Sequence, residues 1–224
     1  MFMEMNDEEI VQVTELPESF TSLCNKRLPK SSQQPLEYLS QRGIKKEEIL
    51  MWKMGYCTEG RYSGRIIVPS FNNSGDLNYF IARSYAGHRM KYLNPPVSKN
   101  IVFNELYVDW DEPVVIVEGV FDAITVGQNG IPILGSSLRE ESKLFQALVL
   151  NDTPIYLALD EDAKKKQNYL IRLFHRYDAD LKIIDTSNVE DVGSMSKEQF
   201  NKRLSSACEP DIDDINFYSQ LAKI

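Results

Sequence analysis

Hydrophobic residues change their spacing near residue 113, and this change predicts two parts of different architecture. Beyond it, short apolar runs without polar alternation are separated by stretches of helical periodicity. Such runs are typical of strands that are buried on both faces of a parallel sheet, with helices as crossovers. We expect strands at 114–117, 131–134, 155–159 and 181–184. We expect helices at 121–128, 140–150, 163–177 and 196–206, and therefore an α/β, Rossmann-like sheet flanked by helices.

The residues before 113 have the pattern of a smaller α+β subdomain. The expected elements are helices at 35–42 and 44–54 and strands at 65–69 and 77–84. Gly43 ends the first helix, and the turn-forming residues Asn72–Asp76 join the two strands into a hairpin. A basic, proline-containing loop follows at 86–100. We divide the chain into an acidic leader and linker (1–33), this subdomain (34–112), the parallel-sheet domain (113–207) and an acidic tail (208–224).

Composition is that of an ordinary globular chain, because 42% of the 224 residues are hydrophobic and 26% are charged. No apolar run approaches the roughly 18 residues of a membrane span, and the N-terminus lacks the apolar segment of a signal peptide. The three cysteines, Cys24, Cys57 and Cys208, are odd in number and far apart. They predict neither a disulfide framework nor a zinc site. We therefore expect a cytoplasmic protein without a membrane partner.

Charge is distributed unevenly along the chain, although the net charge is -8. Residues 1–25 contain six acidic residues and no basic one, whereas residues 26–99 contain thirteen basic and five acidic residues. Residues 100–224 contain twelve basic and twenty-two acidic residues. A cationic segment beside an acidic one predicts a site that holds a polyanion on one side and metal ions on the other.

Acidic residues follow three of the predicted parallel strands, at the edge where open sheets bind ligands. Glu118 follows the first strand, Asp160 and Asp162 follow the third, and Asp191 follows the fourth after a short loop. Neighbouring strands lie about 4.8 Å apart, so these carboxylates can share a divalent ion such as Mg²⁺. Taken alone, the Asp160 and Asp162 pair is also consistent with a helix N-cap and a solvated neighbour, and Glu118 or Asp191 alone is a weaker signal. Asp122 either orients the metal-binding acids without binding the ion itself or simply favours the start of its helix.

Three motifs resemble the Toprim domain of DnaG-type DNA primases of bacteria and phages. They are Val115–Asp122 with its Glu-Gly pair, Leu157–Asp162 with its Asp-x-Asp exit, and Glu190–Gly193. Ahead of them, Gly64–Pro69 and Lys91–Pro95 resemble the primase-specific subdomain that precedes Toprim. The resemblance covers about residues 35–205 and implies an RNA polymerase that writes short primers on single-stranded DNA.

The resemblance also implies a site for nucleotidyl transfer that uses Mg²⁺ or Mn²⁺, with two ions. It assigns metal binding to Glu118, Asp160, Asp162 and Asp191, and catalysis to the first three; Glu118 could instead be a general base. It implies nucleotide or DNA contacts for Arg65, Arg83, Lys91, Tyr92, Asn94 and Lys99. Three of these have a structural alternative: Arg65 as an exposed strand residue, Tyr92 as a core residue and Asn94 as a turn residue. The implied partners are single-stranded DNA, nucleoside triphosphates, a replicative helicase and a zinc-binding primase module in trans.

Three departures from the family pattern bear on these expectations. The cysteine count leaves no zinc-binding domain in residues 1–34, and no large domain follows residue 207. Gly193 stands where the third motif usually has another acid, so one metal ion is expected to bind more weakly. We expect a phage-type or split primase of the bacterial or host cytosol. Two alternatives stay open: a Toprim-type metal-dependent nuclease, and a non-catalytic replication accessory protein with the same fold.

Overall fold

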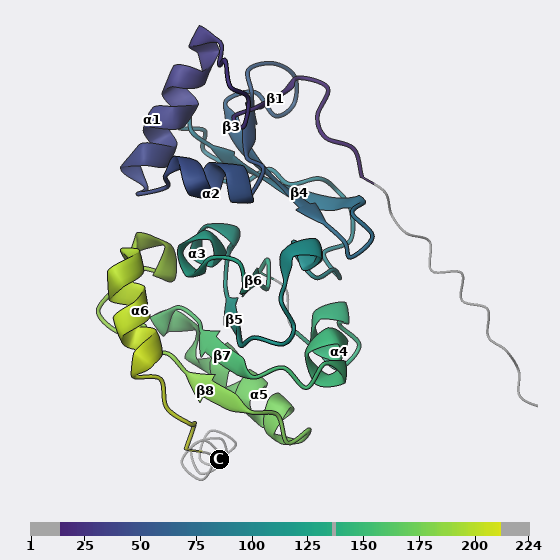
Figure 1. The fold of residues 1–224 in the computed structure, drawn as a ribbon, viewed down its shortest axis with the longest axis vertical. Coiled ribbons are helices and arrows are strands. Elements are labelled where there is room, and N and C mark those ends of the chain that lie inside the picture. Colours follow the sequence, from purple (N-terminus) through teal and green to yellow (C-terminus); the bar gives the residue numbers. More distant parts are fainter. Residues whose placement is uncertain (1–13, 136–137, 212–224) are drawn as a thin grey trace, which may run out of the picture.

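The fold consists of two four-stranded sheets that follow one another along the chain (Figure 1). The computed structural model describes residues 14–135 and 138–211. The first sheet is antiparallel with the order β1-β2-β3-β4, and the second is parallel with the order β6-β5-β7-β8. The expected α/β fold, with a smaller α+β part ahead of a parallel sheet, is confirmed.

The antiparallel sheet contains the predicted hairpin and two shorter strands. Its strands are β1 (Phe20–Ser22), β2 (Gly55–Cys57), β3 (Arg65–Phe71) and β4 (Leu77–Ser84). The hairpin turn is closed by Asn72, whose Oδ1 accepts hydrogen bonds from the backbone N–H groups of Ser74 at 3.0 Å and Asp76 at 2.8 Å. Gly75 has a φ of +85° in this turn, a conformation that glycine adopts without strain.

Two helices cover one face of this sheet, α1 (Gln33–Gln41) and α2 (Lys46–Met51), after a 3₁₀ turn at Lys30–Ser32 (Figure 1). The chain leaves α1 through Gly43, which has a φ of +73°. At the start of α2, the Glu48 carboxylate accepts a hydrogen bond from the backbone N–H of Lys45 at 2.8 Å. A carboxylate in this position satisfies one of the backbone donors that every helix leaves free at its N-terminus.

The part of the fold after residue 113 contains the parallel sheet and every strand and helix that was predicted there. The strands are β5 (Val114–Val117), β6 (Gly130–Pro132), β7 (Ile155–Ala158) and β8 (Leu181–Ile183). The helices are α3 (Val120–Val126), α4 (Lys143–Leu150), α5 (Lys164–His175) and α6 (Lys197–Ser205). The predicted cap of the last helix is confirmed, because Ser196 Oγ accepts from the Gln199 N–H at 3.2 Å. Helix α4 begins three residues later than predicted, because Ser142 takes its N-cap position.

Strand β5 is buried on both faces, as its unbroken apolar run predicts. Val115 and Val117 belong to a core that also contains Phe200 of α6. Val114 and Ile116 point into a second core, formed mainly with α4 and α5. Neither face of this strand meets solvent, which explains why no polar residue interrupts it.

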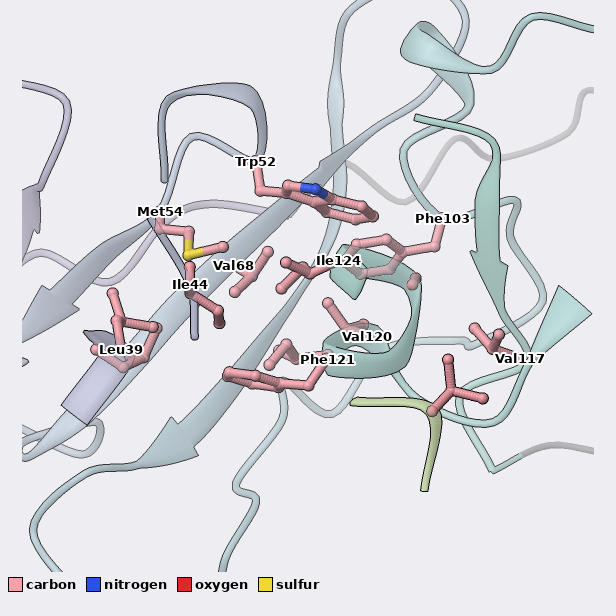
Figure 2. Close-up of a cluster of buried hydrophobic side chains, with 14 of the residues drawn as sticks. Leu39, Ile44, Trp52, Met54, Val68, Phe103, Val117, Val120, Phe121 and Ile124 are labelled. Carbon is pink, nitrogen blue, oxygen red and sulfur yellow. The ribbon is translucent and has the colours of Figure 1, made fainter. Parts of the chain in front are cut away.

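The first of these cores runs without a break from one sheet to the other. Helix α3 lies between them and contributes Val120, Phe121 and Ile124 (Figure 2). These side chains share one cluster with Leu39 of α1 and Val68 of β3. Full burial of a large apolar side chain contributes roughly 1.5–3 kcal/mol, so this shared core holds the two parts firmly together.

The prediction of a leader and linker over residues 1–33 is wrong at Phe20–Ser22. This segment forms β1, which pairs with β2 in the register Phe20 opposite Cys57. A Cβ at Gly55 would overlap the Phe20 ring, so the glycine makes room for this side chain. Strands of three residues are too short to show alternation, and backbone pairing rather than side-chain pattern forms them.

The start of the predicted tail packs on the parallel sheet, where Cys208 forms an antiparallel bridge with Ile183. The rest of that tail from residue 212, and residues 1–13 of the acidic leader, lie outside the described residues. Within residues 14–135 and 138–211, no helix has both the length and the apolar character needed to cross a bilayer.

Candidate functional site

Acidic side chains meet at the carboxyl edge of the parallel sheet. Glu118 follows β5, and Asp160 follows β7, the next strand in the sheet. The register pairs Val117 with Ala158, so the two acids leave adjacent strands near the same level. Asp191 follows β8, which adjoins β7 on its other side. The structure therefore brings three of the predicted site residues to one edge.

Asp122, the predicted supporting residue, joins two segments of the site. Its buried carboxylate accepts hydrogen bonds from the backbone N–H groups of Gly119 and Gly193, each at 2.9 Å. The first bond caps α3 directly after Glu118, and the second fixes the turn beside Asp191. A Cβ at Gly193 would lie 2.9 Å from Asp122 Oδ1, so the glycine permits this close approach. Gly193, where the motif resemblance leads us to expect an acid, thus helps to hold the site together.

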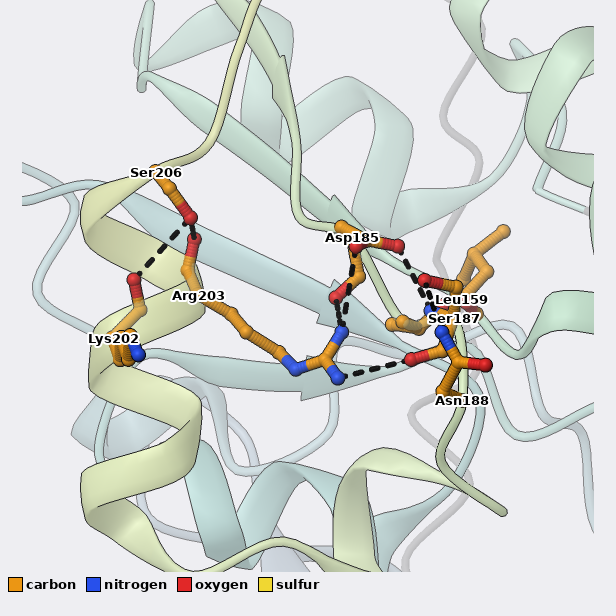
Figure 3. Close-up of polar contacts among 8 residues, drawn as sticks. Leu159, Asp185, Ser187, Asn188, Lys202, Arg203 and Ser206 are labelled. Carbon is orange, nitrogen blue, oxygen red and sulfur yellow. Dashed lines mark hydrogen bonds and ion pairs between the residues drawn. The ribbon is translucent and has the colours of Figure 1, made fainter.

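The loop that leads from β8 to Asp191 is anchored at two points (Figure 3). Arg203 of α6 donates a hydrogen bond to the Asp185 carbonyl at 2.5 Å, and its guanidinium lies 3.6 Å from the Asp185 carboxylate. Thr186 donates its hydroxyl to the Leu159 carbonyl at 2.6 Å. Because Leu159 precedes Asp160 in the chain, this bond ties the loop to the neighbouring acidic segment.

The carboxylates lie close enough together to repel one another. Burial, followed by the negative charges of Asp122, Glu118, Asp191 and Asp162, raises the pKa of Asp160 from 3.8 to about 7. Burial and the charge of Asp191 also raise the pKa of Asp122 to about 6, although its two backbone hydrogen bonds act in the opposite direction. Crowded like charges are unfavourable unless a cation offsets them.

The oxygen atoms at this edge suit a divalent cation. Glu118 Oε1 and Asp160 Oδ1 are buried and have no hydrogen-bond partner. Hard cations such as Mg²⁺ take carboxylate oxygens as ligands. In the part of the chain that the structure describes, however, no three Asp, Glu, His or Cys side chains are arranged to hold one ion. Lys166 Nζ lies 2.9 Å from Glu118 Oε2, and Asp162 is exposed in the turn after β7.

A cluster of arginine and tyrosine side chains lies beside α3. Arg83 of β4 donates hydrogen bonds to the hydroxyl groups of Tyr38 at 2.8 Å and Tyr92 at 2.5 Å. Arg42 donates to the same Tyr38 hydroxyl at 2.8 Å. Both guanidinium groups lie over the Phe121 ring, each 5.1 Å from its centroid. Two cations are therefore held on one aromatic platform.

This cluster adjoins the acidic edge, since Phe121 directly precedes Asp122. Burial, together with the charge of Asp122, raises the pKa of Tyr92, against the opposing effect of Arg83. The Tyr92 residue is nevertheless 40% exposed, so the alternative that it is a core residue is wrong. Arg83 and Tyr92 are thus two predicted contact residues that the structure places next to the carboxylates.

Arg42 and Tyr38 belong to this cluster but were not predicted. The sequence predicted only that both residues belong to the helix at 35–42. Their separation of four residues was the available signal, because residues four apart on a helix lie on the same face.

Two other predicted contact residues hold the basic loop in place. Arg65 is 3% exposed and donates hydrogen bonds to the carbonyl groups of Ala82 at 3.4 Å, Met90 at 3.0 Å and Lys91 at 3.3 Å. The alternative of Arg65 as an exposed strand residue is therefore wrong, and its contact with nucleotide or DNA stays a prediction. Asn94 Oδ1 accepts from the Ala82 N–H at 3.2 Å, which supports its alternative role in shaping the loop. Lys91 is exposed.

Lys99 lies near the end of β6, beside the edge strand of the parallel sheet. It donates a hydrogen bond to the Leu134 carbonyl at 3.1 Å. Together with Ile101, Pro132 and Arg139, it lines a cavity of about 270 Å³. Pro132 ends β6 and pairs with Val117, the residue before Glu118, so this cavity lies at the carboxyl end of the edge strand.

Comparison with known proteins relates both sequence and fold to DNA primases. No family model matches the sequence. The chain is 32% identical to the DNA primase of Thermotoga maritima over 134 residues, which represent 52% of this chain and 24% of that protein. It thus spans about a quarter of the length of this curated relative.

Solved structures match over more of the chain, at lower identity. A DnaG primase catalytic domain bound to single-stranded DNA has a TM-score of 0.71 and 18% identity, over 88% of this chain and 78% of that one. The E. coli primase catalytic core has a TM-score of 0.70 and 18% identity, over 88% and 79%. The RNA polymerase domain of Mycobacterium tuberculosis DnaG, in complex with a DNA duplex with an overhang, has a TM-score of 0.68 and 13% identity, over 87% and 79%.

The parallel sheet with acids after three of its strands, and the antiparallel sheet ahead of it, agree with the architecture that the motif resemblance implies. The chain has the fold of the DnaG primase catalytic core and resembles a bacterial DNA primase in sequence. The resemblance stated from the motifs is confirmed. Its assignment to phages stays a prediction.

Proposed function

We propose that this chain is the catalytic core of a DNA primase, which synthesises short RNA primers on single-stranded DNA by metal-dependent nucleotidyl transfer. The observation that carries the proposal is the position of Arg42 and Arg83 on Phe121, one residue from the carboxylate of Asp122. Arginines that could bind phosphates and acids that could bind metal ions thus lie together at one edge of the sheet. The similarity to the Thermotoga maritima DNA primase supports the same reaction.

Four acids are proposed to bind the metal ions: Glu118, Asp160, Asp162 and Asp191. Two divalent ions, Mg²⁺ or Mn²⁺, stabilise the attacking and the leaving oxygen of a nucleotidyl transfer when they are bound. The unpartnered oxygens of Glu118 and Asp160 support this assignment. The repulsion that raises the pKa of Asp160 supports it as well, because a bound cation relieves that repulsion.

The arginine and tyrosine cluster is proposed to bind the incoming nucleoside triphosphate. Arg83 and Arg42 offer charge-assisted hydrogen bonds to its phosphates, and Tyr38 holds both guanidinium groups in place beforehand. The exposed ring of Tyr92 can stack on a base, and the exposed Lys91 can neutralise phosphate charge. The excess of basic residues between 26 and 99 suits a DNA template.

The proposed partners follow from the same reading. A DnaG catalytic domain of the same fold has been seen bound to single-stranded DNA, and we extend that partner to this chain. A replicative helicase and a zinc-binding primase module acting in trans complete the proposal.

The test is primer synthesis on random single-stranded DNA with Mg²⁺ and nucleoside triphosphates, with and without candidate helicase and zinc-module subunits. We expect ladders of short RNA from the natural chain and none from Asp160→Ala. Glu161→Ala, a change at the exposed neighbouring acid, should still produce them. Shortening of a labelled strand would instead identify a nuclease. A chain that binds no metal, even with nucleotide present, would be an accessory protein.

A further inference from the structure

Lys166 places a positive charge at the acidic edge of the sheet, where it forms an ion pair with Glu118. We propose that Lys166 is a positioning residue that competes with divalent cations for Glu118 and so sets the affinity of the site for metal. This inference rests on the proposed metal site and adds a residue that the family motifs do not include. It concerns the chain before any nucleotide binds.

The geometry places the Lys166 ammonium directly on a proposed metal ligand. Lys166 lies in the first turn of α5, and its Nζ is 2.9 Å from Glu118 Oε2. The two side chains are 31% and 21% exposed, so solvent screens the pair only in part. Among the described residues, no other Lys or Arg forms an ion pair with the acids at this edge.

The position of Lys166 in the first turn of α5 does not stabilise the helix. Three lysines, Lys164, Lys165 and Lys166, open α5. Positive charges are unfavourable at the N-terminus of a helix, where the backbone dipole is positive. Lys164 and Lys165 are exposed to solvent, whereas Lys166 is half-buried against Glu118. The ion pair with Glu118 offsets the unfavourable position of Lys166.

A divalent ion and Lys166 require the same carboxylate. While the ammonium holds Glu118 Oε2, only Oε1 remains without a partner. An arriving ion meets one free oxygen and a positive charge beside it, and both lower its affinity. Lys166 is therefore the counter-ion that offsets the crowded carboxylates until a stronger cation replaces it. Replacement of Lys166 should therefore raise the affinity for the metal ion and lower the stability of the metal-free chain.

The experiment titrates the full chain with Mn²⁺ and follows the free ion by electron paramagnetic resonance. We expect Lys166→Gln to bind Mn²⁺ about three- to fivefold more tightly, the upper part of the range for loss of a partly screened charge pair. Lys166→Arg keeps the charge and should bind like the natural chain. Lys165→Gln removes the same charge at an exposed neighbour and should change the affinity less than about twofold.

Thermal unfolding in a metal-free buffer supplies a second measurement. Lys166→Gln should unfold at a lower temperature than Lys165→Gln, and Mn²⁺ should remove this difference.

Equal or weaker Mn²⁺ binding by Lys166→Gln, or an equal gain in Lys165→Gln, would overturn the role of Lys166 and leave the metal site intact. If neither the natural chain nor Lys166→Gln binds Mn²⁺, the proposed metal site itself fails, and this inference with it. Binding by Lys166→Gln alone would support competition in its strongest form.

Discussion

Replacement of Asp160 by Asn should stabilise the metal-free protein while it abolishes stabilisation by metal. Asp160 is ionised above its pKa, which burial and four neighbouring acids raise from 3.8 to about 7. The folded chain therefore becomes less stable, through this residue, as the pH rises from about 4 to about 7, and the whole loss is present above pH 7. Asn keeps the size of the side chain and removes the charge.

The magnitude follows from the same values. A pKa raised from 3.8 to about 7 corresponds to about 4 kcal/mol of unfavourable free energy for the charged carboxylate. Asp160 is only partly buried, so solvent screening reduces this figure, and we expect a gain of about 1–2 kcal/mol. For a chain of 224 residues, this gain raises the melting temperature by about 2–8 °C.

The assay is thermal unfolding in EDTA and in excess Mg²⁺, at pH 5 and at pH 8. Asp160→Asn should melt above the natural chain in EDTA, with the larger difference at pH 8, and Mg²⁺ should raise only the natural chain. Glu161→Gln removes a charge from the exposed neighbour and is the matched control. Lower stability of Asp160→Asn in EDTA at pH 8, or equal stabilisation of both chains by Mg²⁺, would refute this prediction.

Three further changes test other parts of the structure. Lys91→Ala should raise the KM for nucleotide in primer synthesis by about tenfold, the loss of one charged phosphate contact, and an unchanged KM would remove Lys91 from the site. Glu48→Gln should lower the free energy of unfolding by about 1–2 kcal/mol at pH 7, because it removes the charge that bonds to Lys197 and to the start of α2. Burial raises the pKa of Glu48, but these bonds lower it overall, so the ionised form stabilises the fold. The cost should vanish as the pH falls below the ordinary value of 4.5, and urea titrations that show the same cost at low pH would contradict this. Gly193→Ala should lower the melting temperature, since its Cβ would lie 2.9 Å from Asp122 Oδ1, and an unchanged melting curve would mean that the turn adapts.

The parallel sheet could be predicted from sequence because each of its strands carries its own signal. The run Val114–Val117 is apolar throughout, and the acid after it is therefore placed at the sheet edge by the strand alone. The same holds for Asp160 after β7. Side chains whose positions depend on one continuous strand can be assigned without knowledge of the rest of the chain.

The features that sequence could not predict depend on contacts between distant segments. Strand β1 exists only through its pairing with β2, and three residues show no periodicity. Arg65 has the same sequence context whether its guanidinium points to solvent or, as here, to the carbonyls of a loop about 25 residues later. Lys166 meets Glu118 across 48 residues, and nothing local to either indicates the pair.

Helix α3 has a consequence for how the proposed site would meet its ligands. It carries Phe121, on which both arginines rest, and Asp122, which fixes the acidic turns, while Val120 and Ile124 bury the helix in the core of both sheets (Figure 2). The spacing between cations and acids is therefore set when the chain folds. A ligand that touches both groups meets partners that are already aligned, so little conformational entropy is lost on binding.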